Sequence, residues 1–252
     1  MVARLTIGVR LQKSVKTSAQ MSLSTDPQMG VHRSLIFGVL NALLRVITLQ
    51  LPPIEAQFLR YVSGALVMLP LLQHLELLEK WNRVHNLTAI RDKARAISVH
   101  LLDSLSVVPY LAGERFLDVG SGAGFPGIPI AVAMPDVQMD LLDSNHKKCA
   151  FLRQAIAELG LKNARVVCER VESWRPAEKF DCIISRAVAN VAEVIALVKH
   201  LLAPGGVIAA MKGEHPFEEI ERVPSEFRVR RVHALAVPGL GAERHLVLIE
   251  RA

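Results

Sequence analysis

From Arg115 to the C-terminus, short β-rich runs alternate with helical stretches. The β-rich runs are "RFLDV", "VQMDLLD", "ARVVCER", "FDCIISR" and "GVIAAMK". This alternation predicts an α/β fold with a doubly wound, mostly parallel sheet. Two more strand candidates, "FRVRRVHALAVP" and "ERHLVLIER", are separated only by "GLGA" and its neighbours, so we expect the sheet to end in an antiparallel hairpin. In the second helical stretch, Ser144 can cap the start and Gly160 the end.

The segment before this region is helical in pattern. Residues 34–112 place apolar side chains at mixed three- and four-residue spacings, punctuated by Pro52–Pro53 and Pro70. We therefore expect several packed helices that form an N-terminal cap, followed by a sheet domain over residues 113–252. The basic, acid-poor start resembles an organelle transit peptide but has no apolar stretch of signal-peptide length. We expect residues 1–33 to be a flexible extension, or residues upstream of a natural start at Met21, Met29 or later, in preference to a targeting segment.

Composition limits the class of protein. A chain of 252 residues with 51% hydrophobic residues can bury one well-filled core, and its net charge of +6 mildly favours a polyanionic partner such as nucleic acid. Three cysteines without a CxxC pair suggest neither a disulfide framework nor a zinc site, so we expect no metal. Because no apolar run is long enough to span a bilayer, we expect a soluble, cytoplasmic protein with no membrane partner.

The stretch "FLDVGSGAGFPGIPIAV" lies where a doubly wound sheet binds its ligands, beyond the carboxyl end of the first strand. Gly120, Gly122 and Gly124 permit positive φ and a close approach of a ligand to the backbone. The residues from Gly122 to Gly127 also satisfy GxGxxG, which keeps a nicotinamide-dependent oxidoreductase open. Two prolines, at 126 and 129, remove N–H donors from the turn where a pyrophosphate would be held, which favours a phosphate-free ligand such as S-adenosylmethionine.

Two aspartates accompany the loop. Asp143 follows the second strand, 23 residues after Gly120, close to the spacing at which an acid reaches ribose hydroxyls in such folds. The alternative for Asp143 is an interaction with the positive end of the helix that follows. Asp118 ends the first strand beneath the glycines, where it can orient the loop or face the amino-acid part of the ligand.

With these residues in place, the chain resembles the bacterial small-subunit ribosomal RNA methyltransferase G family from about Leu75 onward. The resemblance rests on "KWNRVHNLTAIRD", "HLLDSLSVVPYL", "RFLDVGSGAGFPGIPIA", "LLDSNHKKCAFLRQ", "RVES", "ISRAVA", "MKG" and "ERHLVLI". It implies a Rossmann-like class I methyltransferase that uses S-adenosylmethionine and makes 7-methylguanosine in 16S rRNA, with naked RNA or the small ribosomal subunit as its partner. Residues before about Ile54 extend beyond the usual start of the family.

The resemblance also implies a cofactor pocket made by Gly120, Phe125, the Val171–Glu172 pair and Arg186, to which the loop analysis adds Gly122 and Asp143. From the residues alone, Phe125 serves equally well as a core side chain, and Glu172 as a surface acid. Arg186 can position guanine O6, bind a phosphate or the carboxylate of the cofactor, or form a structural salt bridge.

The residues after the fourth strand indicate which kind of atom is methylated. The sequence "ISRAVA" contains neither the D/N-P-P-Y/F pattern of amino-group methyltransferases nor a Pro-Cys pair for pyrimidine carbons. Guanine N7 carries an unprotonated lone pair, so no catalytic acid or base is assigned. For RNA contacts we select Arg91, Lys212 and Arg244, which lie within the motif matches. The alternatives left open are methylation of another RNA or of a small molecule, the oxidoreductase, and a non-catalytic ribosome-binding module.

Overall fold

The computed structural model describes residues 53–90, 92–186 and 189–252, all within one compact unit. The expectations for residues 1–33, and for the cap before residue 53, lie outside the described residues. Within the described part, no helix is long and apolar enough to cross a membrane.

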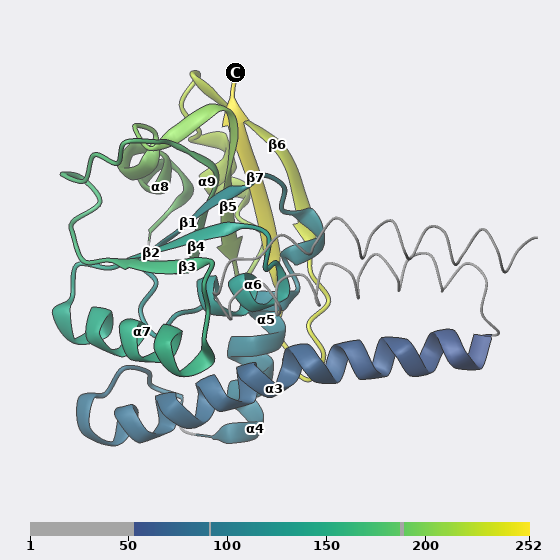
Figure 1. Cartoon of the computed structure of the whole chain (residues 1–252). Helices are drawn as coiled ribbons and strands as arrows, with labels where there is room; N and C mark the ends of the chain where they lie inside the picture. Colours follow the sequence, from purple (N-terminus) through teal and green to yellow (C-terminus); the bar gives the residue numbers. More distant parts are fainter. Residues whose placement is uncertain (1–52, 91, 187–188) are drawn as a thin grey trace, which may run out of the picture. The chain divides into compact units, whose positions relative to one another are not determined.

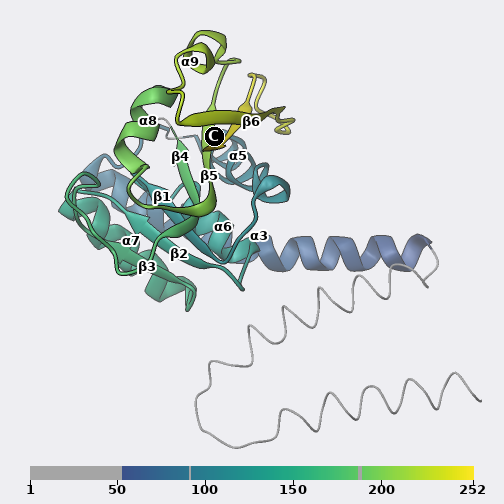
Figure 2. The same ribbon diagram turned by 90° about the horizontal axis from the view of Figure 1, so that it is seen from above.

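A seven-stranded sheet organises the chain from Arg115 onward, in the order β3-β2-β1-β4-β5-β7-β6 (Figure 1). The strands are β1 (Arg115–Val119), β2 (Gln138–Leu142), β3 (Ala164–Val167), β4 (Phe180–Arg186), β5 (Leu202–Lys212), β6 (Phe227–Ala234) and β7 (His245–Arg251). Strands β1 to β5 pair in parallel, and β7 pairs antiparallel with both β5 and β6. The predicted parallel sheet with a C-terminal hairpin is therefore confirmed. Figure 2 shows the succession of strands from β3 to β6 across the sheet.

The segment before the sheet is helical wherever it is described. It contains α3 (Pro53–His85), α4 (Lys93–Ala96), the π-helical turns of η1 (Ile97–Leu102), α5 (Asp103–Leu105) and the short η2 (Val108–Tyr110). Pro70 does not separate two helices as its position suggested, because it lies inside α3. Burial explains this tolerance: Leu71, Leu77 and Leu78, just after the proline, are core residues, and their packing offsets the missing backbone hydrogen bond.

Helices cover both faces of the sheet and create two apolar clusters. One face packs against α3, α6 (Gly127–Ala133) and α7 (His146–Leu159), with Phe116, Leu141 and Phe151 among its fully buried side chains. The opposite face packs against α8 (Val191–Val198), whose apolar positions contact strand residues such as Ile183. This layering, visible in Figure 1, leaves the carboxyl edge of the parallel strands for a site.

The start of α7 differs by one residue from the prediction. Asn145, not Ser144, is the N-cap, and its side-chain oxygen accepts from the backbone N–H groups of Lys147 and Lys148. Ser144 is one position too early to reach these groups. The predicted helix end is confirmed, because Gly160 adopts the left-handed conformation with φ of 63°.

Candidate active site

The glycine loop after β1 is held in a conformation that side chains would oppose. Gly120, Gly122 and Gly124 have φ values of 71°, 57° and 86°. A Cβ atom on Gly124 would press into the side chains of Ile128 and Leu152, so this glycine packs the loop onto the core. A Cβ on Gly122 would meet only the Gly120 carbonyl oxygen, at 3.7 Å, which leaves the outer side of the loop open to a ligand.

Four backbone donors of this loop are already used within the protein. Both Gly120 and Ser121 donate to the Leu142 carbonyl oxygen, at 2.8 and 3.1 Å, which ties the loop to the end of β2. Both Gly124 and Phe125 donate to the Ser121 carbonyl oxygen, at 2.7 and 3.2 Å. A pyrophosphate bound at a helix start relies on free N–H groups, and these four are unavailable for it. The loop therefore suits a ligand without phosphate.

Asp118 supplies a negative floor under the loop. Its side chain is 1% exposed, and one oxygen accepts from the Gly127 N–H at 2.9 Å. The other oxygen, Oδ1, has no hydrogen-bond partner in the described part of the chain. Burial raises the pKa of Asp118 to about 6, against the opposing effects of the Gly127 N–H and Arg186. A buried carboxylate with a spare acceptor favours a cationic ligand, and S-adenosylmethionine carries an ammonium and a sulfonium.

Asp143 ties the loop to α7. One of its oxygens accepts from the Gly122 N–H at 3.0 Å, and the other from the Asn145 N–H at 2.8 Å. Lys148 Nζ lies 3.6 Å from the first oxygen. The interaction with the helix start is thus present, and each carboxylate oxygen keeps a second lone pair for a further donor such as a ribose hydroxyl.

Phe125 lies in the core at the tip of the loop. Its ring is 4% exposed and stacks on His100, with centroids 4.6 Å apart and planes 9° from parallel. The His74 ring lies 5.0 Å away, and its Nε2 donates to the Ala123 carbonyl oxygen at 3.0 Å. Phe125 was expected to line the cofactor pocket or to be a core side chain. In the structure it is a core side chain that packs the loop against α3 and η1.

The predicted adenine-side residues follow β3. Val171 is half-buried against the apolar cluster on the α8 face. Glu172 is exposed, and its carboxylate lies 3.6 Å from the Arg170 guanidinium. Neither contact determines a ligand role, so cofactor binding by this pair stays a prediction.

Arg186 and Arg244 converge on one carboxylate that sequence reasoning did not select. Arg186 Nη1 lies 3.2 Å from Asp103 Oδ2, and Arg244 Nε lies 3.0 Å from Asp103 Oδ1. Asp103 is 2% exposed, and Arg186 also donates to the Val99 carbonyl oxygen at 3.1 Å. Asp103 lies in the segment "HLLDSLSVVPYL". An acidic residue within an apolar helical run is seldom buried without a partner, and this pattern could have pointed to Asp103 from the sequence.

The three predicted RNA contacts are not equally placed. Arg244 lies in the cluster around Asp103. Lys212 Nζ donates to the Ala189 carbonyl oxygen at 2.8 Å and pairs with Glu219 at 2.7 Å, so it also fastens β5 to its neighbours. Arg91 lies outside the described residues.

Two buried histidines make the stability of the loop support depend on pH. Burial lowers the pKa of both His74 and His100 to about 4, and the positive charge of Arg186 contributes at His100. In the unfolded chain they titrate near the ordinary value, so their contribution to stability is intact above about pH 6.5 and is lost as pH falls toward 4. We expect the free energy of unfolding to fall in this window by up to about 1.4 kcal/mol per pH unit for each histidine.

Chemical denaturation at a series of pH values measures this effect. A His74→Gln, His100→Gln double variant is the control, since its unfolding free energy lacks both titrations. Equal pH slopes for the double variant and the parent chain between pH 6.5 and 4 would contradict the assignment.

Comparisons with known proteins agree with this geometry. The sequence profile of the family described as rRNA small subunit methyltransferase G matches residues 69–247. The chain is 58% identical over 177 residues to "Ribosomal RNA small subunit methyltransferase G" of Laribacter hongkongensis, covering 70% of this chain and 86% of that protein. It is 57% identical over 176 residues to the protein of the same name from Chromobacterium violaceum, covering 69% of this chain and 84% of that protein.

Solved structures share the fold at low sequence identity. The glycopeptide N-methyltransferase MtfA, complexed with S-adenosylmethionine, superimposes with a TM-score of 0.51 at 13% identity, covering 61% of this chain and 87% of that one. A second MtfA structure gives a TM-score of 0.52 at 14% identity, covering 63% of this chain and 99% of that one. These likenesses identify a class I methyltransferase fold.

Proposed function

The chain belongs to the rRNA small subunit methyltransferase G family, and we propose that it methylates N7 of a guanine in 16S rRNA at the glycine loop, with S-adenosylmethionine as donor. The observation that carries the proposal is the Asp118 Oδ1 atom, which has no hydrogen-bond partner among the described residues and lies below a glycine loop with five backbone N–H groups already bonded within the protein. This combination accepts a cation and offers a pyrophosphate little, which argues against a nicotinamide enzyme.

The donor fits the residues at the carboxyl edge. It supplies an electrophilic methyl group bound to sulfur. Asp118 would receive the ammonium group, and Asp143 would accept from the ribose hydroxyls through its spare lone pairs. Gly120 and Gly122 would let the ligand lie against the backbone, and Val171–Glu172 would border the adenine.

The protein needs to align the acceptor rather than to move a proton. Guanine N7 attacks with a lone pair in the plane of the ring, so positioning and water exclusion carry the rate enhancement. Arg186 and Arg244 present guanidinium groups beside one another because both bind Asp103. They would anchor guanine O6 or a flanking phosphate, and Lys212 and Arg91 would make further contacts with the RNA.

The helical segment that ends near residue 112 acts as a cap in this proposal. It holds the loop through His74 and His100, and it supplies Asp103 to the arginines of the sheet domain. Residues 113–252 would then be the methyltransferase domain proper, and residues 1–33 an N-terminal extension.

One experiment tests the reaction and its position. Small ribosomal subunits that lack the modification, and naked 16S rRNA in parallel, are incubated with the protein and radiolabelled S-adenosylmethionine, then digested to nucleosides. We expect the label in 7-methylguanosine. Label in another nucleoside would refute the position, and no label in either substrate, with S-adenosylmethionine bound in calorimetry, would refute an rRNA substrate.

A further inference from the structure

We propose that a cavity between η2 and β6, away from the methyl-transfer edge, is a second RNA site that holds one unpaired nucleotide flanking the target. This inference rests on the proposed function, because it names where else the same RNA is held. The cavity has a volume of about 460 Å³. It is lined by Tyr110, Leu111, Ala112, Cys182, Val207, Arg230, Arg231, His233 and Leu248.

The charge of the lining suits a phosphate. Two arginines line the cavity, and no acidic side chain of the described residues does. Burial and the charge of Arg231 lower the pKa of His233, so its ring is a neutral hydrogen-bonding group there. Arg231 is exposed and has no ion pair within the described ranges, whereas Arg230 Nη1 forms a long ion pair with Glu250 Oε2, at 3.9 Å. A guanidinium group without an ion-pair partner, as that of Arg231 is within the described ranges, attracts an RNA phosphate and can bind it in bidentate fashion.

The rim of the cavity offers a surface for a base. The Tyr110 ring is 38% exposed and lies against His233, with centroids 4.1 Å apart and planes 32° from parallel. The floor is apolar, with Leu111, Val207 and Leu248. Exposed aromatic rings next to arginines are how proteins hold unpaired bases, since every base has a face that stacks.

The topology places the cavity within reach of the same RNA strand. Across the sheet, Arg231 of β6 is in register with Leu248 of β7, and Leu248 is in register with Ala209 of β5. Arg186 of β4 is in register with Met211, two residues farther along β5 toward the carboxyl edge. Strand spacing and rise put Arg231 on the order of 15 Å from Arg186. The cavity therefore suits a nucleotide near the target guanine and not the target itself.

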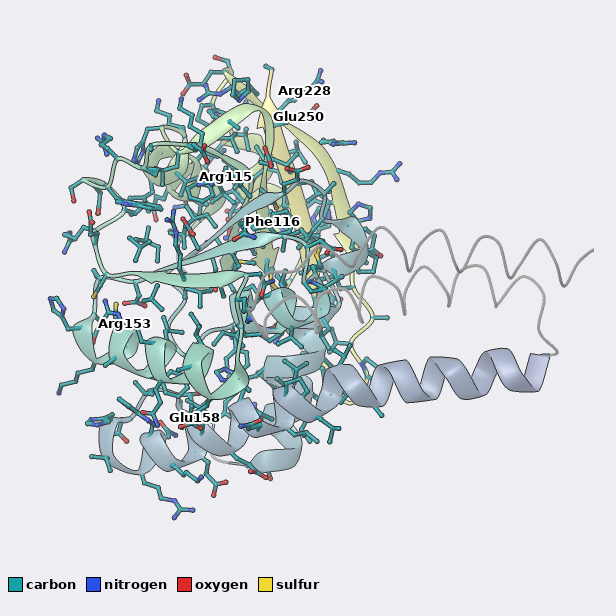
Figure 3. The ribbon with its side chains drawn as sticks, viewed as in Figure 1. Arg115, Phe116, Arg153, Glu158, Arg228 and Glu250 are labelled. Carbon is teal, nitrogen blue, oxygen red and sulfur yellow. The ribbon has the colours of Figure 1, made fainter. Side chains whose placement is uncertain are left out.

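The test compares two variants with a matched control in the full-length protein. In Arg231→Gln and Tyr110→Ala we expect the KM for small subunits lacking the modification to rise at least about fivefold, with kcat and the affinity for S-adenosylmethionine unchanged. For Arg231→Gln the slope of log affinity against log salt should shrink by about 1. Arg228→Gln removes the same charge from the same strand, but Arg228 is paired with Glu250 at 2.6 Å (Figure 3). Neither of these two residues lines the cavity.

The control separates a site from a general charge effect. A KM for Arg228→Gln close to the parental value, together with a raised KM for both cavity variants, supports the site. Equal effects of Arg228→Gln and Arg231→Gln, or no effect of Tyr110→Ala in a variant that melts at the parental temperature, would overturn it. Filter binding of subunits gives the same comparison without methyl transfer, so failure of the reaction and failure of this site are distinguishable.

Discussion

Asp118→Asn is expected to weaken the binding of S-adenosylmethionine by about 10- to 100-fold, the range for losing a charge-assisted hydrogen bond in a buried site. The spare Oδ1 atom is the acceptor for the ammonium group in our proposal, and an amide cannot supply the charge. Titration calorimetry of the free protein measures the loss directly.

Asp118 also predicts how binding depends on pH. Its pKa of about 6 in the free protein means that the carboxylate forms as pH rises through 6, against burial and the nearby charge of Asp143 and with the help of Arg186. A cationic ligand needs the ionised form, so affinity should increase from pH 5 to 7. Asp118→Asn should abolish this increase.

Stability distinguishes the role of Asp118 from a structural one. Folding raises the pKa of Asp118, so the protonated side chain favours the folded state. Its contribution to the free energy of unfolding is fully present below the pKa of an aspartate in the unfolded chain, and it is lost as pH rises through about 6. At neutral pH a neutral asparagine should therefore be no less stable. Asp140→Asn, which breaks the buried carboxylate pair with Arg165 on the neighbouring strands, is the control: it should lower stability and leave cofactor affinity intact. A loss of stability without a loss of cofactor affinity in Asp118→Asn, or a loss of cofactor affinity in Asp140→Asn, would refute the role of Asp118 in cofactor binding.

Asp103→Asn is expected to lower methyl transfer at saturating S-adenosylmethionine by about 100-fold, since small misplacements of the groups that hold the acceptor cost that much. An asparagine oxygen can accept from one arginine, while its amide hydrogens repel the other. We also expect a stability loss of about 2 kcal/mol, less than for a fully buried pair, because the side chains of Arg186 and Arg244 are 20% and 23% exposed.

A double-mutant cycle identifies Asp103 as a positioning residue. If Asp103 acts by holding Arg244, then Arg244→Gln in the Asp103→Asn background should cost much less activity than in the parent chain. Rates are measured well below the melting temperature of each variant, so that unfolding does not contribute. Strictly additive losses of activity would show that Asp103 and Arg244 act independently.

The fold was predictable because local patterns and the global arrangement agree. The β-rich runs became the seven strands, and Gly160 ended α7 as expected. The continuous α3 was not predictable, since what overrides Pro70 is burial against parts of the chain that are distant in sequence. The N-cap of α7 is Asn145 and not the predicted Ser144. The backbone conformation before the helix determines which of these two adjacent polar side chains reaches the free N–H groups of its first turn.

The site was predictable where a single segment builds it and not where segments meet. The glycine loop and Asp118 follow from "LDVGSGAG" alone. Asp103 was not predicted as a site residue because its partner Arg244 lies 141 residues later in the chain, and the sequence alone does not show that the two meet. Phe125 likewise shows its core role only through His100, which the fold brings from the preceding helical segment. Cofactor contacts of Val171, Glu172 and Arg186 remain predictions.

The position of β6 at the end of the sheet has a consequence for solubility. A terminal strand exposes unpaired backbone groups on which another chain could assemble, and cationic side chains along such a strand discourage this. Arg228, Arg230 and Arg231 lie on this strand, and all three are exposed. Charge on this strand would thus serve as a gatekeeper against β-aggregation, and a variant in which all three arginines are replaced by glutamine should precipitate at lower concentration than the parent.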